Sequence, residues 1–538
     1  MTRDLPRQVL WVVAAAPFMA CLELGRRIYA NNDDARFAVL AQDVLKHGFR
    51  LFPDLNGVPY YNKPPLLAWL IALVSWPTGA VSQITAAVPS AGAGVGLAFV
   101  VLALGRGMFG PDAGRVAALV AVATQGFFLQ ARLPLPDMLL TLLVTAALWH
   151  FWRMTRDGAR GTHWIGFYGF TAAAFWAKGP AGFLPLAVAL GCAVVNRGDG
   201  GWRRLRPLPG LALLVALVGP WWLFAFRTDG AAARSAVVVD QLLWYLPVSV
   251  GVQSVAAPLR NSFGTLFPWV LVVPLVLARA VRCARGADAE RRDVRALLAW
   301  AAVTFVVVAV SRQQRLRYYL PLVPPVALLV GWWVAIAVPR RRDAARVPWR
   351  ACAVLVALLA AATAGVLFAS GGLPQDAAIS LPAFPVEALA LAAALGAMLL
   401  ALVWGVRRGR IGRAFAVAWL GSAAFVAGAY HWEVGRLNVA NDYPRVAERM
   451  RPALGDAAVV ASWGLPELPL SFYLNRRVVG VKTSAALDRV MSEKPAVAVV
   501  TEAALARRED RARLVVLVRD RLALQSISLI RQEFANHP

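Results

Sequence analysis

The feature that most constrains this chain is a series of long apolar segments separated by short connections rich in arginine. Of its 538 residues, 59% are hydrophobic and 16% are charged, whereas soluble proteins have about 45–50% apolar and about 25% charged residues. A helix of roughly 17–25 apolar residues can cross a bilayer. The sequence therefore predicts a polytopic α-helical membrane protein. We expect thirteen transmembrane helices, at 8–24, 88–105, 113–131, 137–153, 164–179, 180–196, 207–226, 262–281, 296–311, 317–338, 350–370, 384–406 and 413–431.

Segment 64–80 is also apolar, but its core is short and ends at Trp76-Pro77-Thr78-Gly79. We interpret it as an interfacial helix that does not cross the membrane. With the N-terminus in the cytoplasm, the arginine-rich connections then fall on the cytoplasmic side, as the positive-inside rule requires. If 64–80 crossed, these connections would move to the wrong side. The count of thirteen therefore predicts that the long loop 25–87 is extracytoplasmic.

The composition changes after His431. Residues 432–538 contain no apolar span, and a segment of about 105 residues is long enough to form its own core. The odd number of spans places it outside the cytoplasm. We therefore expect a transmembrane domain at 1–431 and an extracytoplasmic α/β domain at 432–538. Its expected strands are Ala457–Trp463, Arg477–Val481, Ala496–Thr501 and Leu514–Val518, and its expected helices are Tyr443–Leu454, Ser484–Glu493 and Glu502–Arg511.

The net charge of +26 does not indicate a nucleic-acid partner, because the arginines gather in the connections between apolar spans. The sequence contains no Walker loop, no GxGxxG after a strand, no His-rich metal motif and no Ser-His-Asp arrangement. These observations disfavour chemistry driven by a nucleotide. We expect a substrate that is already activated and that reaches the site from the membrane.

Three acids are predicted to lie at the extracytoplasmic face: Asp33, Asp34 and Asp137. Ionisable groups near the hydrocarbon are costly and are by default functional. Arg36, close to the first pair, would keep a carboxylate ionised, which suits a general base or a metal ligand. The alternative is that Asn31-Asn32-Asp33-Asp34 caps the start of a helix. The two interpretations are compatible.

Basic residues are predicted at the same face. Lys63 follows Tyr60-Tyr61-Asn62 at the start of the interfacial segment, and Lys178 precedes Gly179-Pro180 at a helix break. Either lysine can hold a phosphate, or extend to a lipid headgroup as an ordinary interfacial side chain. The stretch Arg312 to Pro321, with Arg315, Arg317 and Tyr318, runs against the positive-inside trend. An anionic ligand explains this exception, and a structural salt-bridge cluster is the alternative.

At these positions the chain resembles the polyprenyl-phosphate-sugar glycosyltransferases, which have the GT-C fold and include the aminoarabinose transferases of lipid A and the protein O-mannosyltransferases. The family's Asp-Glu-x-Arg-Tyr-Ala motif resembles residues 33–38, and its Glu-Lys-Pro-Pro resembles residues 62–65. Its Ala-Arg…Asp-Met segment resembles residues 131–138, its Thr-Lys-Gly-Pro resembles 177–180, and its basic stretch before Tyr-Leu-Leu-Pro resembles 315–321.

The resemblance implies a catalytic aspartate, here Asp33, and basic residues that grip a lipid phosphate. It also implies a bacterial inner (plasma) membrane protein. Asn62 stands where the family motif has glutamate, and loop 227–261 contains no histidine. No cofactor is required by the motifs, and a divalent metal stays open.

We therefore expect an inverting transfer of one sugar from a polyprenyl-phosphate donor to an extracytoplasmic glycolipid, polysaccharide or protein. Asp33 would deprotonate or orient the acceptor, with Asp34 beside it, and Asp137 would complete the site. The expected donor-binding residues are Arg36, Tyr60, Lys63, Lys178, Arg315, Arg317 and Tyr318. The rival hypothesis is a transporter or flippase of lipid-linked sugars. Such proteins often have paired repeats, and the sequence shows none.

Overall fold

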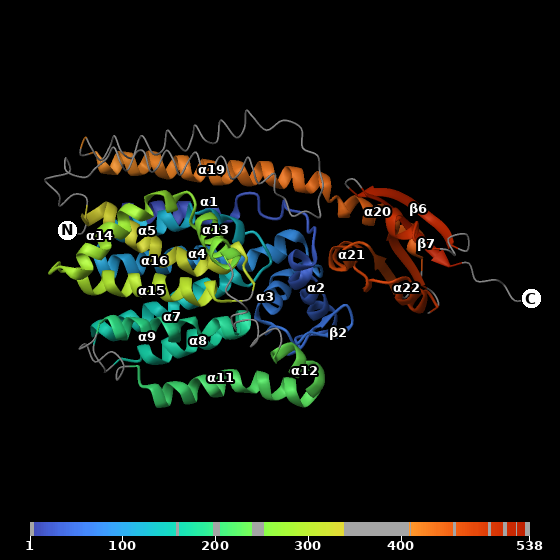
Figure 1. Cartoon of the computed structure of the whole chain (residues 1–538), viewed down its shortest axis with the longest axis horizontal. Coiled ribbons are helices and arrows are strands. Elements are labelled where there is room, and N and C mark those ends of the chain that lie inside the picture. The colour runs from blue at the N-terminus through green and yellow to red at the C-terminus, as the bar shows by residue number, and fades with distance from the viewer. Residues whose placement is uncertain are drawn as a thin grey trace, which may run out of the picture.

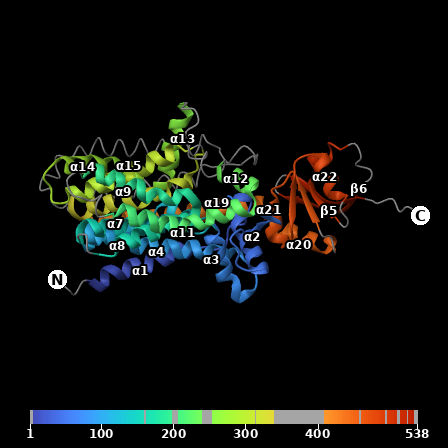
Figure 2. The same cartoon turned by 90° about the horizontal axis from the view of Figure 1, so that it is seen from below.

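The computed structural model describes residues 5–157, 161–196, 205–238, 252–311, 313–337, 408, 410–455, 459–492, 496–508, 514–522 and 525–532. It has an elongated helical unit with a smaller α/β unit at one end (Figures 1 and 2). Helix α2 and helix α3 lie at that same end of the helical unit (Figure 1). The described α-helices of the helical unit are α1 (Leu5–Cys21), α2 (Asn32–His47), α3 (Leu66–Ser75), α4 (Gln83–Phe109), α5 (Pro111–Val122), α6 (Gln125–Gln130), α7 (Asp137–Asp157), α8 (His163–Lys178), α9 (Leu184–Val195), α11 (Pro207–Thr228), α12 (Gly230–Val237), α13 (Val252–Leu266), α14 (Val273–Arg285), α15 (Arg291–Ala309), α16 (Val323–Trp332) and α19 (Ile411–Ala440).

Six of the described helical segments are long and apolar enough to cross a membrane, or seven if one bent pair is counted as a span. They make the chain a multi-pass membrane protein. The segments are Gln83–Phe109, Asp137–Arg156, His163–Val195, Pro207–Thr228, Leu316–Ile336 and Gly412–Leu454. The expected count of thirteen is therefore not reached in the described part of the chain. The predicted spans 350–370 and 384–406 and the residue Arg312 lie outside it.

Two predicted spans are broken in the structure. Segment 113–131 forms α5 and α6, because the chain is extended at Thr124 and the Gln125 N–H donates to the Phe267 carbonyl at 2.8 Å. Segment 262–281 is bent by 107° between residues 266 and 269. The periodicity of apolar residues does not reveal either break, because both sides of each break are apolar.

Two other expectations about helices agree with the structure. The segment 64–80 forms the short apolar helix Leu66–Thr78. The predicted break at Gly179-Pro180 lies between α8 and α9, where the 3-10 turn η2 (Gly179–Phe183) folds back on α8. A Cβ on Gly182 would lie only 2.1 Å from the backbone nitrogen of Phe175. The end of α8, with Lys178, is therefore fixed by a tight turn.

The core of the helical unit depends on close contacts between small residues. A Cβ on Gly105 of α4 would lie 2.6 Å from the Cα of Gly114 on α5. Gly331 of α16 approaches the carbonyl of Ala113 equally closely. Small residues at such positions let membrane helices pack backbone to backbone. The span that contains α16 is 89% buried, whereas the span of α11 is 28% buried and faces outward.

The α/β unit has a five-stranded sheet in the order β4-β3-β5-β7-β6. Strands β3 (Val459–Trp463), β4 (Val478–Val481) and β5 (Ala496–Thr501) are parallel, and β6 (Leu514–Leu522) and β7 (Gln525–Gln532) complete the sheet as an antiparallel pair. Its helices are α20 (Tyr443–Leu454), α21 (Glu467–Leu474), α22 (Ser484–Met491) and α23 (Glu502–Leu505). All four predicted strands and the first two predicted helices are present, whereas the predicted helix Glu502–Arg511 is helical only to Leu505 in the described residues, and α21 and β7 were not predicted. Helix α19 continues to Ala440, beyond the predicted boundary at residue 431.

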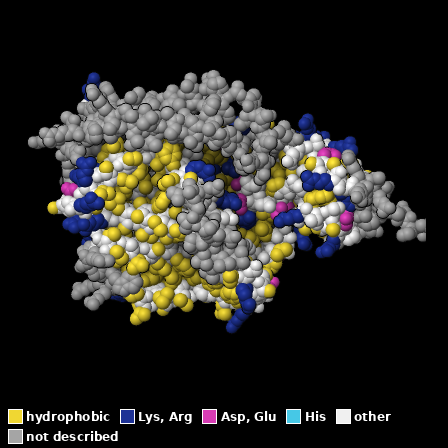
Figure 3. All heavy atoms as spheres, viewed as in Figure 1, with side chains coloured by type: hydrophobic (Ala, Val, Ile, Leu, Met, Phe, Trp, Pro, Cys, Tyr) yellow, Lys and Arg dark blue, Asp and Glu magenta, His cyan; other side chains and the backbone are white. Residues whose placement is uncertain are grey.

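The surface of the helical unit differs in charge along its length. Lys and Arg side chains gather at the end opposite the α/β unit, and hydrophobic side chains cover much of the visible face between the ends (Figure 3). At the other end, α21 packs on α2. Asp33 and Asp34 lie in the first turn of α2 and are therefore next to this junction.

Candidate active site

The candidate site begins at the first turn of α2, where four consecutive polar residues make different contacts. Asn31 is the N-cap, and its side chain accepts a hydrogen bond from the Asp34 N–H at 3.0 Å. The Asp34 carboxylate turns inward, accepting from Arg27 at 2.8 Å and from the Asn31 amide at 3.0 Å. Asp34 is 4% exposed. The capping prediction for this segment therefore agrees with the structure, and Asp34 faces away from the other predicted site residues.

Asp33 points instead into a cluster of arginines. Its carboxylate is paired with Arg315, with Arg36 at 2.9 Å and with Arg317 at 3.0 Å. Burial by itself would raise the pKa of this carboxyl, but the neighbouring guanidinium groups outweigh burial and lower the pKa from 3.8 to about 2. Asp33 is therefore ionised at neutral pH. It binds three arginines that come from two distant parts of the sequence.

Asp137 is the first residue of α7 and is 2% exposed. Its Oδ1 is paired with the ammonium of Lys178, which ends α8, and its Oδ2 lies 3.7 Å from the Arg317 Nε. No described group donates a hydrogen bond to Oδ2, although this atom is buried. A buried carboxylate oxygen costs free energy when it is left unsatisfied, so Oδ2 is an acceptor that a bound substrate can use.

Arg317 joins the two acids into one site. Its guanidinium contacts both Asp33 and Asp137, and it lies 5.4 Å from the ring centre of Tyr318. The ammonium of Lys178 is 4.3 Å from the same ring centre. Arg317 and Tyr318 belong to the 3-10 helix η6 (Leu316–Leu322), whose Leu316 carbonyl accepts from the Thr265 hydroxyl at 2.7 Å. Segments that are far apart in sequence therefore meet at one point.

Lys63 lies beside this cluster in the loop before α3. No ion pair or hydrogen bond of its ammonium is found among the described residues, and its charged neighbours include Lys178 and Arg36. Burial, followed by repulsion from these cations, lowers the pKa of Lys63 from 10.5 to about 7. Tyr60, three residues earlier, is 8% exposed, and its N–H donates to the Pro53 carbonyl at 3.1 Å. Lys63 is therefore a cation placed without an anionic partner of its own.

The described residues at this site do not form a ligand set for a divalent metal. Among the described residues, no group of three His, Cys, Asp or Glu side chains is close enough to hold an ion. Asp33 and Asp137 are both paired with cations, and the position beside Lys63 is Asn62. The described histidines contact other partners: His47 contacts Asp43, His431 contacts Glu23, and His150 contacts His163. Positive charge in this site comes from arginine and lysine.

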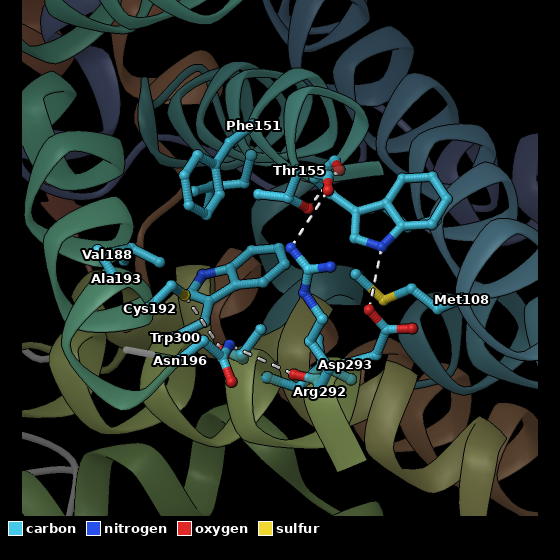
Figure 4. Close-up of a pocket in the computed structure, with 15 residues that line it drawn as sticks. Met108, Phe151, Thr155, Val188, Cys192, Ala193, Asn196, Arg292, Asp293 and Trp300 are labelled. Carbon is cyan, nitrogen blue, oxygen red and sulfur yellow. Dashed lines mark hydrogen bonds between the residues drawn. The ribbon is translucent and has the colours of Figure 1, made fainter. Parts of the chain in front are cut away.

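A separate pocket lies at the other end of the bundle, between α4, α7, α9 and α15 (Figure 4). Its lining includes Thr155, Asp293 and Trp300. Asp293 accepts from the Trp152 indole at 3.2 Å and is paired with Arg156. Along α7, Thr155 is roughly 27 Å from Asp137 at the usual helical rise. This pocket therefore does not belong to the cluster of Asp33 and Asp137.

Sequence reasoning missed two residues that shape the site. Arg27 holds Asp34, and Arg132 is 3% exposed and donates to the carbonyls of Met19, Leu22 and Phe128. Arg132 thereby closes the end of α1 against α6 and stacks on Phe128, with its guanidinium 3.3 Å from the ring centre. The motif at residues 131–138 contains Arg132, and its charge between two apolar segments was the signal, but the sequence analysis gave this arginine no role.

Comparison with known proteins agrees with this fold. Residues 62–224 match the family model of dolichyl-phosphate-mannose-protein mannosyltransferases. An undecaprenyl phosphate-α-4-amino-4-deoxy-L-arabinose arabinosyl transferase of Shewanella sediminis is 25% identical over 66% of this chain and 65% of its own length, slightly less than two thirds. The crystal structure of ArnT from Cupriavidus metallidurans bound to undecaprenyl phosphate superposes with a TM-score of 0.78, at 19% identity over 97% of both chains.

The fold is thus that of the GT-C membrane glycosyltransferases, with a cluster of acids and cations where α2, α7, α8 and η6 meet. Within that class, the chain is similar to transferases that use a polyprenyl-phosphate sugar, through the family model at residues 62–224 and the relatives at about 25% identity.

Proposed function

We propose that this chain transfers one sugar, with inversion, from a polyprenyl-phosphate donor to an acceptor outside the cytoplasm. The observation that carries the proposal is Arg317, which contacts both the partly exposed Asp33 and the buried Asp137, while Lys63 and Lys178 lie beside it. The site combines a carboxylate that can act on an acceptor hydroxyl with cations that can receive a phosphate. The names of the relatives, which include undecaprenyl phosphate, support the same donor class.

The cations would bind the donor phosphate and stabilise it as a leaving group. Five basic side chains surround two carboxylates: Arg36, Lys63, Lys178, Arg315 and Arg317. In the transfer, the acceptor oxygen forms a bond to the anomeric carbon, and the bond from that carbon to the phosphate oxygen breaks. The phosphate keeps the electron pair and leaves as polyprenyl phosphate. Preorganised cations stabilise such developing charge without a further general acid.

Asp33 would take the proton of the acceptor hydroxyl or orient that hydroxyl. While it is paired with three arginines, a carboxylate with a pKa of about 2 is a weak base. A bound phosphate would compete for Arg315 and Arg317, and weakening either ion pair would raise the basicity of Asp33. The donor would therefore activate the base by binding to the cations that hold it.

Asp137 would bind the substrate through its buried Oδ2, which accepts no hydrogen bond from a described group and lies 3.7 Å from the Arg317 Nε. A sugar or acceptor hydroxyl is a suitable donor to this oxygen. Asp34 would have a structural role, because Arg27 and Asn31 occupy its carboxylate. Tyr318 would lie under the donor phosphate, since its ring already contacts two of the cations.

The location follows from the same arrangement. The site lies next to the α/β unit, and basic side chains gather at the opposite end (Figure 3). By the positive-inside rule, that basic end faces the cytoplasm. We therefore propose an inner-membrane protein of bacteria with a cytoplasmic N-terminus and an extracytoplasmic C-terminal α/β unit.

The test is release of polyprenyl phosphate by the purified full chain in proteoliposomes made from bacterial lipid extract, followed by mass spectrometry. Asp33→Asn should reduce release by roughly 10²–10⁴-fold, the usual contribution of a positioned base. Asp54→Asn is the matched control, because Asp54 lies in the same loop and is paired with Arg50 instead, at 3.6 Å. Equal release by the Asp33 variant and wild type would remove Asp33 from the mechanism. Movement of donor lipid without release would instead support a transporter.

A further inference from the structure

We infer that the C-terminal α/β unit positions the catalytic end of α2, and that Asn32 and Tyr473 are the positioning residues. The chemical part of this inference rests on the proposed function. It is carried by hydrogen bonds that link the residues immediately before Asp33 to α21 of the α/β unit.

Asn32 caps a helix in the other unit. The first amides of a helix have no partner within the helix and need an acceptor from outside. The N-cap of α21 is Pro466, whose side chain offers none. The Leu468 N–H, at the second position of α21, donates to the Asn32 Oδ1 at 3.0 Å. Leu468 is 3% exposed, so this asparagine supplies the missing cap where water has little access.

Asn31 and Asn32 therefore cap two different helices. Asn31 caps its own helix, because its Oδ1 accepts from the Asp34 N–H. Asn32, the next residue, caps α21. The backbone around Asp33 is thus held by the bond from the Asp34 N–H to Asn31 and by the bond from Asn32 to the α/β unit.

The segment leading into α2 is held in the same way. The Tyr29 N–H donates to the Tyr473 hydroxyl oxygen at 2.9 Å, and the Tyr29 ring packs against Phe472 with centres 4.9 Å apart. On the other side, Asn438 of α19 accepts from the Ile28 N–H at 3.0 Å and donates to the Arg26 carbonyl at 2.8 Å. Residues 26–32 are thus fixed between α19 and α21.

This arrangement matters for catalysis because two of the arginines that face Asp33 come from elsewhere. Arg315 and Arg317 belong to the region of η6, and among the described residues their side-chain hydrogen bonds and ion pairs go to Asp33 and Asp137, not to α21. If α2 moved relative to η6, Asp33 would move relative to the phosphate-binding cations. A misplacement of about 1 Å can reduce turnover by about 10²-fold.

The test compares Asn32→Ala with Lys46→Ala in the full chain. Lys46 also bonds to the α/β unit, through the Asn475 side chain at 2.8 Å, but from the far end of α2. We expect Asn32→Ala to lower kcat for polyprenyl phosphate release by roughly tenfold to a hundredfold, with KM for the donor changed less than about twofold. Lys46→Ala should keep the kcat of wild type. Asn32→Asp, which retains an acceptor oxygen, should recover most of the activity.

Hydrogen–deuterium exchange supplies a readout that is independent of turnover. Amides of residues 28–36 should exchange faster in Asn32→Ala than in wild type or Lys46→Ala. If Asn32→Ala does not fold, Tyr473→Phe removes the other acceptor and keeps the aromatic contact. The inference would be overturned if Asn32→Ala (or Tyr473→Phe in its place) kept the kcat of wild type. It would also be overturned if kcat fell without faster exchange of the amides at 28–36. A wild-type protein that releases no polyprenyl phosphate would refute the proposed function instead, and the exchange comparison would still test the positioning.

Discussion

The carboxylate of Asp137 and the ammonium of Lys178 form an ion pair in which the side chains are only 3% and 10% exposed. The pair joins the first residue of α7 to the last residue of α8. In such surroundings each charge depends on the other, because neither can be hydrated fully.

The first prediction concerns this pair. Lys178→Met should destabilise the protein by up to about 3–5 kcal/mol, because it removes the nearest cation from the buried Asp137 carboxylate and leaves Arg317 at 3.7 Å. The double variant Asp137→Asn with Lys178→Met should recover much of that stability and still lack transfer activity. Thermal unfolding in detergent measures the first effect, and polyprenyl phosphate release measures the second. Additive decreases of stability in the double variant would contradict the prediction.

The second prediction separates binding from turnover at Asp33. Removing its charge frees Arg315 and Arg317 for the donor phosphate, so Asp33→Asn should bind undecaprenyl phosphate about two- to fivefold more tightly than wild type, the size of an ion pair that is partly exposed. The same variant should be nearly inactive. Microscale thermophoresis with Asp54→Asn as the control measures the affinity. Weaker binding by Asp33→Asn would show that the carboxylate does not compete with the phosphate.

The third prediction concerns pH. The pKa of Lys63 is lowered to about 7 by burial and by neighbouring cations. The ammonium is therefore populated below pH 7 and deprotonated as the pH rises through 7, so its attraction for a phosphate should weaken from pH 6 to pH 8. Lys63→Arg stays charged over this range and should lack that component. The ratio of undecaprenyl phosphate affinities, wild type to Lys63→Arg, should fall with rising pH. A constant ratio would show that Lys63 does not contact the phosphate.

The fourth prediction concerns metal. Both acids are paired with basic side chains, and no described group of ligands fits an ion. We therefore expect transfer to continue after dialysis against EDTA, with less than one equivalent of Mg, Mn or Zn found by elemental analysis. Loss of release on chelation, restored by one of these metals, would assign the phosphate-binding role to that metal.

The fifth prediction concerns orientation. In a chain without native cysteines, Val58→Cys, which replaces a residue that is 61% exposed, should react with a reagent that does not cross the membrane in intact cells. Arg285→Cys, at the exposed end of α14, should react only after the membrane is opened. Labelling of both variants in intact cells would contradict the proposed topology.

Much of the site could be predicted from the sequence, because charge in an apolar chain is rare. Asp33, Asp137, Lys178 and Arg317 stand out against their surroundings, and counting spans placed them at one face. The detailed contacts could not be predicted in this way. Asp33 and Asp34 are adjacent, yet successive side chains on a helix point about 100° apart, so one meets η6 and the other meets Arg27.

The breaks in helices were hidden for a different reason. Near Thr124 and Phe267 the chain stays apolar on both sides, and the backbone bond from Gln125 to Phe267 depends on a tertiary contact. The cap that Asn32 provides to α21 also joins segments that are far apart in sequence. Local sequence patterns indicate which charged residues are unfavourable near a membrane. Helix breaks and caps between units instead depend on which distant segments pack together.

Helix α19 is a single element of 30 residues. At the usual rise it is about 45 Å long, whereas the hydrocarbon layer is about 30 Å thick. If α19 stands upright, about one third of its length would extend beyond the hydrocarbon layer, into the headgroup region. Asn438, near the end of α19, bonds to the residues that lead into α2. We therefore expect that a tilt of α19 in a thinner or thicker membrane would shift the position of Asp33.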